Sequence, residues 1–231
     1  MNKGVYNRTK RVLGLGINDA DYVTQTYEVV GGVRKKLWSC PYYMRWYDML
    51  KRVTGRANPR GSNNSYEGVA ISEEWKTFSK FKDWMEQQDW EDKHLDKDLL
   101  SEGVRIYSED TCVFLGRNVN NFLIERGFDR GDCPIGVSRM NRAGLKKPYQ
   151  SCISIRGDRV RLGYYTTPEE AHNAWQVAKY NYGVELMNEQ TDVRVKEALR
   201  KILSSLKYQY ENGIITESLL KTIDTPSPTV F

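Results

Sequence analysis

The sequence predicts an α+β fold of small antiparallel sheets and amphipathic helices, and two neighbouring patterns carry this prediction. Residues 149–155 and 159–165 alternate in polarity on either side of Arg156-Gly157-Asp158, which is typical of a tight β-hairpin turn. The segment Thr167-Pro168-Glu169-Glu170 then supplies a capping hydroxyl, a proline at the first helical position and two acids near the positive helix end. We therefore expect a sheet covered by a helix here.

The N-terminal part of the chain predicts one strand and two helices. Residues 23–30 are expected to form a strand that Gly31-Gly32 turns back. From residue 39, an early proline and apolar side chains near a 3.6-residue period predict a helix, and residues 55–65 are interpreted as a loop. A second helix is expected from residue 72 or 73 to about 88, with one apolar face: Trp75, Phe78, Phe81, Trp84 and Met85.

Five of the six tryptophans lie between Trp38 and Trp90. A platform on which nucleic-acid bases stack is one interpretation. Helical spacing of aromatic residues is what packing of a core demands, so we interpret these tryptophans as core residues of a helical scaffold.

Residues 93–123 hold the residues with the clearest chemical potential. His94, Asp96 and Asp98 alternate, so an extended strand would present all three on one face. A hairpin through 101–103, a second strand at 111–115 and a short helix from about Arg117 would return Asn118, Asn120 and Asn121 toward that strand. Hard divalent cations prefer carboxylate and amide oxygens, so the pattern predicts a one-metal site. A solvated, charged strand is the alternative interpretation of Asp96 and Asp98.

The chain continues beyond this segment with a linker, a final helix and a polar tail. Residues 127–135 are rich in Gly, Asp and Pro, residues 192–211 show a helical period with a basic face, and residues 222–231 are expected to be disordered. We expect three parts: 1–127, 134–188 and 189–231.

Charge is distributed unevenly, although the net charge is only +5. Residues 66–98 hold ten acidic residues against five lysines, whereas between Gly136 and Tyr165 seven basic residues are opposed by Asp158 alone. This contrast indicates metal handling in the middle of the chain and binding of a polyanion near its C-terminal end. A solvated basic surface is the alternative interpretation.

The cysteines and the hydropathy pattern indicate the expected cellular location of the protein. Cys40, Cys112, Cys133 and Cys152 are scattered without a CxxC pair, so no zinc is expected, and dispersed thiols suit a reducing compartment. No apolar run approaches membrane-spanning length and the N-terminus lacks a signal-peptide core. We expect no membrane partner and a cytoplasmic location, which is the host cytoplasm for a phage-encoded chain.

Residues 136–178 resemble the Apetala/ethylene-response-factor DNA-binding domain of plants, which is also found attached to phage and mobile-element nucleases. The matching positions are Gly136-Val137, Tyr149, Ser151, Ile153, Leu162-Gly163-Tyr164, Thr167, Glu169, Glu170, Ala171, Ala174 and Ala178. The resemblance implies three antiparallel strands packed on one helix, with the strands in the major groove of duplex DNA. It assigns DNA contacts to Arg139, Lys146, Lys147, Tyr149, Arg156, Arg159 and Arg161.

The pattern LDKDLL…YSEDTCVFLGRNVNNF resembles a divergent branch of the HNH (ββα-metal) endonucleases, which are found largely in phages as homing enzymes. Upstream matches are Gly14 to Tyr22, Cys40-Pro41-Tyr42-Tyr43 with Trp46 and Met49-Leu50, and Glu74-Trp75 with Phe78, Phe81 and Trp84. The two resemblances together imply a degenerate HNH-like module with a helical scaffold, followed by the Apetala-like sheet and a C-terminal helix.

The HNH resemblance assigns roles to individual residues. Asp96 would be a ligand of one Mg²⁺ (or Mn²⁺), Asn120 its partner from the helix, and Asp98 a second carboxylate. The sequence lacks the first-strand histidine that serves as the base in the family, so His94 would have to act from two residues earlier. Lys97 is expected to stabilise negative charge on phosphate.

The expected function is sequence-directed binding of double-stranded DNA with metal-dependent phosphodiester hydrolysis. The alternative is a catalytically degenerate DNA-binding protein that acts as a regulator or host-takeover factor. An inhibitor that binds a host protein is a third class, which would show no salt-dependent affinity for DNA.

Overall fold

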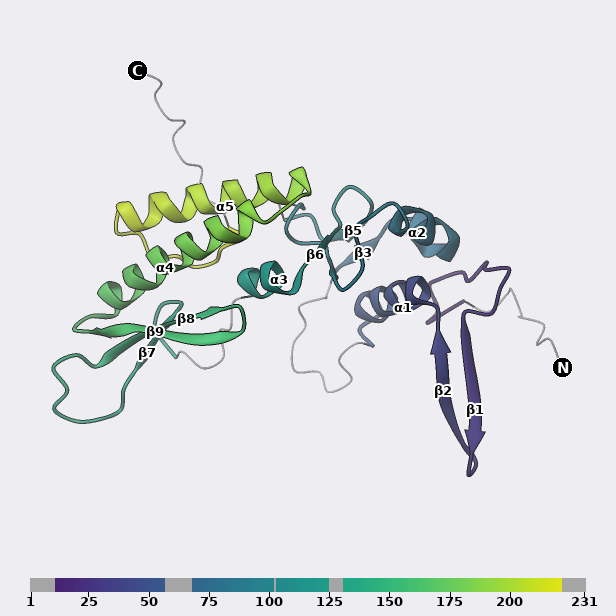
Figure 1. The fold of residues 1–231 in the computed structure, drawn as a ribbon, viewed down its shortest axis with the longest axis horizontal. Helices are drawn as coiled ribbons and strands as arrows, with labels where there is room; N and C mark the ends of the chain where they lie inside the picture. Colours follow the sequence, from purple (N-terminus) through teal and green to yellow (C-terminus); the bar gives the residue numbers. More distant parts are fainter. Residues whose placement is uncertain (1–10, 57–67, 102, 125–130, 222–231) are drawn as a thin grey trace, which may run out of the picture. The chain divides into compact units, whose positions relative to one another are not determined.

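The computed structural model describes residues 11–56, 68–101, 103–124 and 131–221. It confirms a mixed α+β fold and divides the chain into two compact units, unit 1 (Met1–Phe114) and unit 2 (Leu115–Phe231), shown in Figure 1. Most of the expected 55–65 loop, part of the 127–135 linker and the 222–231 tail lie outside the described residues. Among the described helices, none has the length and apolar composition that crossing a membrane requires.

Over its described residues, unit 1 combines two-stranded sheets, one of which ends at the unit boundary, with two α-helices and a 3₁₀ turn. The predicted strand and glycine turn are confirmed as an antiparallel hairpin of β1 (Gln25–Val30) and β2 (Val33–Ser39). The predicted helix is α1 (Pro41–Val53). Strand β3 (Ala70–Ile71) pairs in parallel with β5 (Ile106–Tyr107), and β4 (His94–Asp96) pairs with β6 (Val113–Leu115).

The core of unit 1 is aromatic, as the helical spacing predicts. Trp46, Trp75 and Trp84 are buried, and the Trp46 indole donates a hydrogen bond of 2.7 Å to the Trp75 carbonyl oxygen. The ring of Phe78 meets Tyr43 edge-on at 5.4 Å, which joins α1 to α2 (Phe78–Met85). The prediction is wrong for Trp38, which is 48% exposed on the hairpin.

The helix expected from residue 72 or 73 to 88 is interrupted. Glu74–Lys76 forms a 3₁₀ turn, Thr77 is extended, and α2 begins only at Phe78. The cause is a pairing with a distant segment: the Ile17 N–H donates to the Lys76 carbonyl at 2.7 Å, and the Phe78 N–H donates to the Ile17 carbonyl at 2.9 Å. The Lys76 carbonyl and the Phe78 N–H are therefore both hydrogen-bonded to Ile17, so a continuous helix cannot form through Thr77.

The segment Gly14 to Tyr22 packs against both α1 and α2. Gly16 lies so close to α1 that a Cβ there would fall 2.5 Å from Leu50 and 2.6 Å from the Trp46 ring. The Asp19 carboxylate accepts hydrogen bonds from the Ser79 N–H (2.9 Å) and hydroxyl (2.6 Å). An acid at this position satisfies an unpaired N–H in the first turn of α2 and interacts favourably with its positive end.

Unit 2 contains the predicted three-stranded antiparallel sheet, in the order β7 (Val137–Arg139), β8 (Tyr149–Ile155), β9 (Asp158–Tyr165). Arg156 and Gly157 have φ values of 50° and 98°, and two consecutive positive φ angles are the mark of the tight hairpin turn that the sequence predicts. The cap is confirmed as well, because the Thr167 hydroxyl accepts from the Glu170 N–H at 3.2 Å where α4 (Pro168–Asn188) begins.

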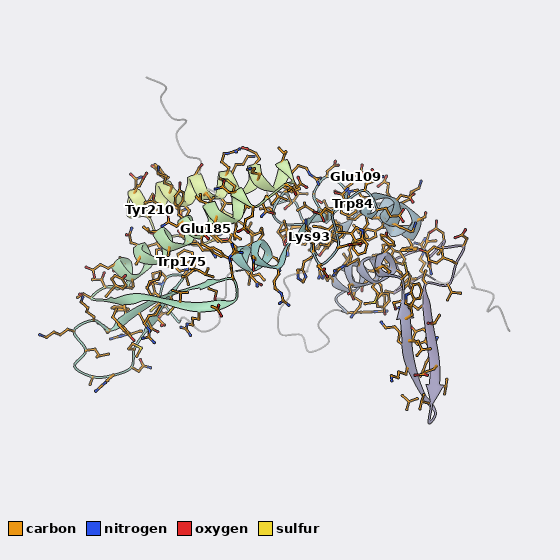
Figure 2. All side chains as sticks on the ribbon, in the orientation of Figure 1. Trp84, Lys93, Glu109, Trp175, Glu185 and Tyr210 are labelled. Atoms are coloured by element: carbon orange, nitrogen blue, oxygen red, sulfur yellow. The ribbon has the colours of Figure 1, made fainter. Side chains whose placement is uncertain are left out.

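Helix α4 is the centre of unit 2. It covers one face of the sheet and packs along α5 (Val193–Glu211), the predicted last helix, as Figures 1 and 2 show. Trp175, labelled in Figure 2, fills the space beside Gly136, where an added Cβ would lie 2.1 Å from the indole. An added Cβ at Gly183 would lie 2.4 Å from Leu203 of α5 and 2.9 Å from Phe122 of α3 (Arg117–Leu123). The sheet is thereby held with one face against α4.

Candidate functional site

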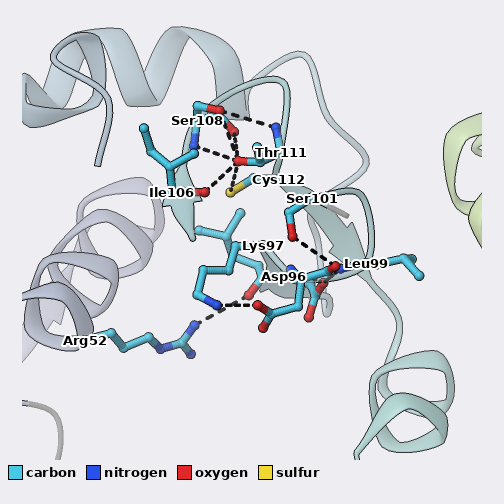
Figure 3. Close-up of polar contacts among 11 residues, drawn as sticks. Arg52, Asp96, Lys97, Leu99, Ser101, Ile106, Ser108, Thr111 and Cys112 are labelled. Atoms are coloured by element: carbon cyan, nitrogen blue, oxygen red, sulfur yellow. Dashed lines mark hydrogen bonds and ion pairs between the residues drawn. The ribbon is translucent and has the colours of Figure 1, made fainter. Parts of the chain in front are cut away.

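The first strand of the predicted metal segment ends at Asp96, so one part of the prediction is wrong. We expected His94, Asp96 and Asp98 on one face of a strand, but β4 covers only His94–Asp96. The Asp96 Oδ1 accepts hydrogen bonds from the backbone N–H groups of Asp98 (3.0 Å) and Leu99 (2.8 Å), as seen in Figure 3. An aspartate that binds the backbone two and three residues on forms a turn, and this turn removes Asp98 from the strand.

Lys97 points into unit 1 and is only 5% exposed. Its ammonium lies 5.9 Å from the centre of the Tyr107 ring and forms an ion pair with the Asp98 carboxylate, which is itself half exposed. Figure 3 shows Lys97 together with Arg52, whose guanidinium donates to the Leu95 carbonyl at 3.5 Å. In this arrangement Lys97 has a structural partner that the sequence did not reveal.

The environment of Asp96 disfavours its charge. Burial raises the pKa of this carboxyl above its usual value, the hydrogen bond from the Leu99 N–H opposes the shift, and the nearby Asp98 carboxylate adds to it. Asp96 is therefore a destabilised anion near neutral pH, which is compatible with two roles: a turn residue, or an acid that a cation would stabilise.

A second turn, Ser108–Thr111, lies near the Asp96 turn, and its polar side chains are hydrogen-bonded within the turn. The Thr111 hydroxyl donates to the Ile106 carbonyl at 2.7 Å and lies 3.0 Å from the Ser108 hydroxyl. Cys112 follows in the core with no exposed surface, and burial raises the pKa of its thiol to about 12. Cys112 therefore stays protonated near neutral pH and acts as a core residue.

The predicted ligands of the divalent cation are divided between the two units. Asp96 and Asp98 belong to unit 1, whereas Asn120 lies half-buried on α3 in unit 2, so their meeting stays a prediction. His94 is exposed on β4. Within the described residues, no three His, Cys, Asp or Glu side chains are grouped as metal ligands. One Asp96 oxygen binds the backbone and Asp98 pairs with an ammonium, so Asp98 would have to release this partner, and Asp96 would have to use its other oxygen, to hold a cation.

The face of the sheet opposite α4 offers a different kind of site. Direct cross-strand partners share a face, so the pairs Gln150–Tyr164, Cys152–Arg161 and Ser154–Arg159 define one surface. The other face carries Val137, Ser151 and Ile153, which are buried against the helix side. We call the first surface the open face; it consists of Ser138, Gln150, Cys152, Ser154, Arg159, Arg161 and Tyr164.

The open face is cationic, polar and aromatic. Arg159, Arg161 and Tyr164 are exposed, and none of the seven residues is acidic. The Arg161 guanidinium lies 5.6 Å from the centre of the Tyr164 ring, and the Gln150 amide donates to the Tyr164 hydroxyl at 3.1 Å. These interactions restrict the side chains before any partner arrives, which lowers the entropic cost of binding.

The remaining predicted DNA-binding residues are spread around the open face. Lys146 and Lys147 are exposed in the β7–β8 loop, and Arg139 is exposed but pairs with Tyr149 on the face that α4 covers. Arg156 forms an ion pair with Glu189 at the end of α4, and its backbone N–H donates to the Tyr182 hydroxyl at 3.1 Å. The basic residues therefore do not form the single face that we expected from the sequence.

Sequence reasoning missed part of the open face. Gln150 and Ser154 were not assigned to it, although the alternation of β8 before the predicted turn would have placed them on one face, opposite the two arginines of β9. Tyr164 joins this face only because an irregularity beside Leu162 shifts the alternation of β9 by one residue, and the interior glycine Gly163 is the sequence signal for it.

No protein-family model, curated protein or solved structure matches this chain.

Proposed function

We propose that the protein binds double-stranded DNA through the open face of the β7–β8–β9 sheet. The observation that carries this proposal is the pair Arg159 and Arg161, exposed on adjacent outward positions of β9 with no acid on the same face. A guanidinium suits phosphate oxygens and the acceptor edge of guanine, and a ribbon of strands is one of the elements that the major groove admits.

Polar, aromatic and basic side chains surround the two arginines and support this proposal. Gln150 and Ser154 add donors and acceptors on neighbouring positions of β8, and Tyr164 holds Arg161 in place. Lys146 and Lys147 add charge from the loop. Phosphate contacts position a protein on DNA and side chains that reach base edges give it specificity, so this surface carries both kinds of group.

The test is a binding titration of duplex DNA with an R159A/R161A variant. We expect this variant to bind more weakly than wild type and with a smaller dependence on salt. The matched control is R200A/K207A, which removes two exposed cations from α5 and leaves the sheet intact. Equal affinities of the two variants would contradict the proposed interface.

Hydrolysis of phosphodiesters is a second candidate. Strand β4 pairs with β6, and α3 follows β6, which is the strand, strand, helix order of the HNH endonucleases that the sequence resembles. Nicking of a supercoiled plasmid with Mg²⁺ or Mn²⁺ tests it. Asp96→Asn is the informative variant, since the amide oxygen can still accept the Leu99 N–H while the carboxylate is removed. Undiminished nicking by Asp96→Asn would reject Asp96 as a ligand, and no nicking by wild type would favour a protein that only binds DNA.

A further inference from the structure

The β1–β2 hairpin is covered by no described helix of unit 1 over most of its length. Its base is tied down where the Cys40 N–H donates to the Thr24 carbonyl at 2.8 Å. Figure 1 shows the two strands leaving α1 and extending away from it. Apolar side chains on the hairpin remain in solvent: Val29 (71% exposed), Val30 (59%), Val33 (69%), Leu37 (60%) and Trp38 (48%). An isolated two-stranded hairpin is marginally stable in water, so this exposure points to a partner.

One face of the hairpin is cationic. The cross-strand pairs Tyr27–Lys36 and Val29–Arg34 place two cations beside an aromatic ring. The Arg34 guanidinium lies 3.8 Å from the centre of the Tyr27 ring, and the Tyr27 hydroxyl donates to the Gln25 side chain at 2.8 Å. A guanidinium stacked on a ring loses little freedom on binding and still presents its N–H edge to an acceptor.

The opposite face is close to neutral. Glu28 lies directly across from Lys35, and Thr26 from Trp38, while Val30 faces Val33 next to the Gly31–Gly32 turn. The hairpin therefore has a charged side for an anionic surface and an apolar tip. The six residues of β1 span about 20 Å, which is enough to cross a major groove about 12 Å wide.

We propose that the β1–β2 hairpin is a second DNA-binding element, which enters the major groove with Arg34 and Lys36 on the phosphates and the valine tip against the bases. Charge complementarity favours duplex DNA as the occupant, since three cations are opposed by one acid along Gln25–Ser39. Apolar side chains at the tip suit contact with thymine methyl groups. A-form RNA has a deep and narrow major groove that this ribbon does not fit.

This inference rests on the proposed binding of DNA but uses a surface in the other unit, so the two can fail separately. The experiment compares wild type with three variants of the full chain: R34A/K36A on the hairpin, R159A/R161A on the sheet, and the control R200A/K207A. Binding to a fluorescent duplex is measured over a series of NaCl concentrations, and circular dichroism checks that each variant is folded. All six positions are exposed, so we expect native spectra.

The expected result is a smaller salt slope for R34A/K36A than for the control, by about 0.9 for each phosphate that the variant no longer neutralises. Wild-type binding by R34A/K36A, with weaker binding by R159A/R161A, would overturn the hairpin proposal and leave the open face standing. Weaker binding by R34A/K36A alone would support the hairpin and overturn the open face. Sedimentation of the same variants is the second readout: a wild-type dimer that R34A/K36A abolishes, with DNA binding unchanged, would assign the hairpin to protein contacts and overturn the proposal.

Discussion

Asp96 is the residue at which a structural and a catalytic interpretation compete most directly. Its side chain ends β4 by accepting two backbone hydrogen bonds, and its surroundings raise the pKa of the carboxyl through burial. A group whose pKa is higher in the folded than in the unfolded protein binds its proton more tightly when folded. The free energy of unfolding therefore falls as pH rises from below the ordinary carboxyl pKa, about 4, to above the raised value.

We expect Asp96→Asn to remove this component of the pH dependence. Near neutral pH the variant should be at least as stable as wild type, because it keeps an oxygen acceptor for the turn and carries no charge. Urea unfolding at several pH values measures this, with Asp83→Asn on the exposed side of α2 as the control. A clear drop in stability of Asp96→Asn near neutral pH would show that the charge itself is needed by the fold.

Ser151 poses a smaller question at the same scale. It is fully buried between Val137 and Gly163 in the sheet register, and its hydroxyl has no hydrogen-bond partner among the described residues. A buried, unsatisfied hydroxyl costs about 1–3 kcal/mol. We expect Ser151→Ala to raise the free energy of unfolding by about 1 kcal/mol, whereas Ser154→Ala on the exposed side of β8 should change it little. Destabilisation by Ser151→Ala would indicate a partner for the hydroxyl.

At the scale of elements, the sequence was sufficient to predict those turns and helix ends whose stabilising interactions join residues close in sequence. The β8–β9 turn and the Thr167 cap are built from neighbouring residues, and both could be predicted. The second scaffold helix could not, because Ile17 breaks it from sixty positions away in sequence. The turn at Asp96 was not predicted for another reason. An aspartate in an alternating pattern fits a strand and a turn equally well until its hydrogen bonds are known.

The packing of α4 gives an element-scale prediction. Alanine normally stabilises a helix relative to glycine, but a Cβ at Gly183 would lie 2.4 Å from Leu203 and 2.9 Å from Phe122. We expect Gly183→Ala to lower the free energy of unfolding by about 1–3 kcal/mol through overpacking. Asn181→Ala, at an exposed position of the same helix, should be neutral or slightly stabilising. Denaturant titration distinguishes the two, and a stabilising Gly183→Ala would contradict the packing of α3 and α5 on α4.

At the scale of the whole molecule, the two units present separate cationic surfaces made of antiparallel strands. Each combines an arginine held against a tyrosine ring with a second cation nearby: Arg34 on Tyr27 in unit 1, Arg161 beside Tyr164 in unit 2. The sequence indicated the second surface through its excess of basic residues. It did not indicate the first, since the register that brings Arg34 over Tyr27 appears only in the folded hairpin.

The most direct test of the central claim is the salt dependence of duplex DNA binding by wild type and R159A/R161A. If the open face lies on DNA, the slope of log K against log salt should be shallower in the variant, by about 0.9 for each phosphate left without its arginine. The control R200A/K207A should keep the wild-type slope. Parallel lines for wild type and R159A/R161A would show that these arginines do not meet phosphate, and the proposed interface would be wrong.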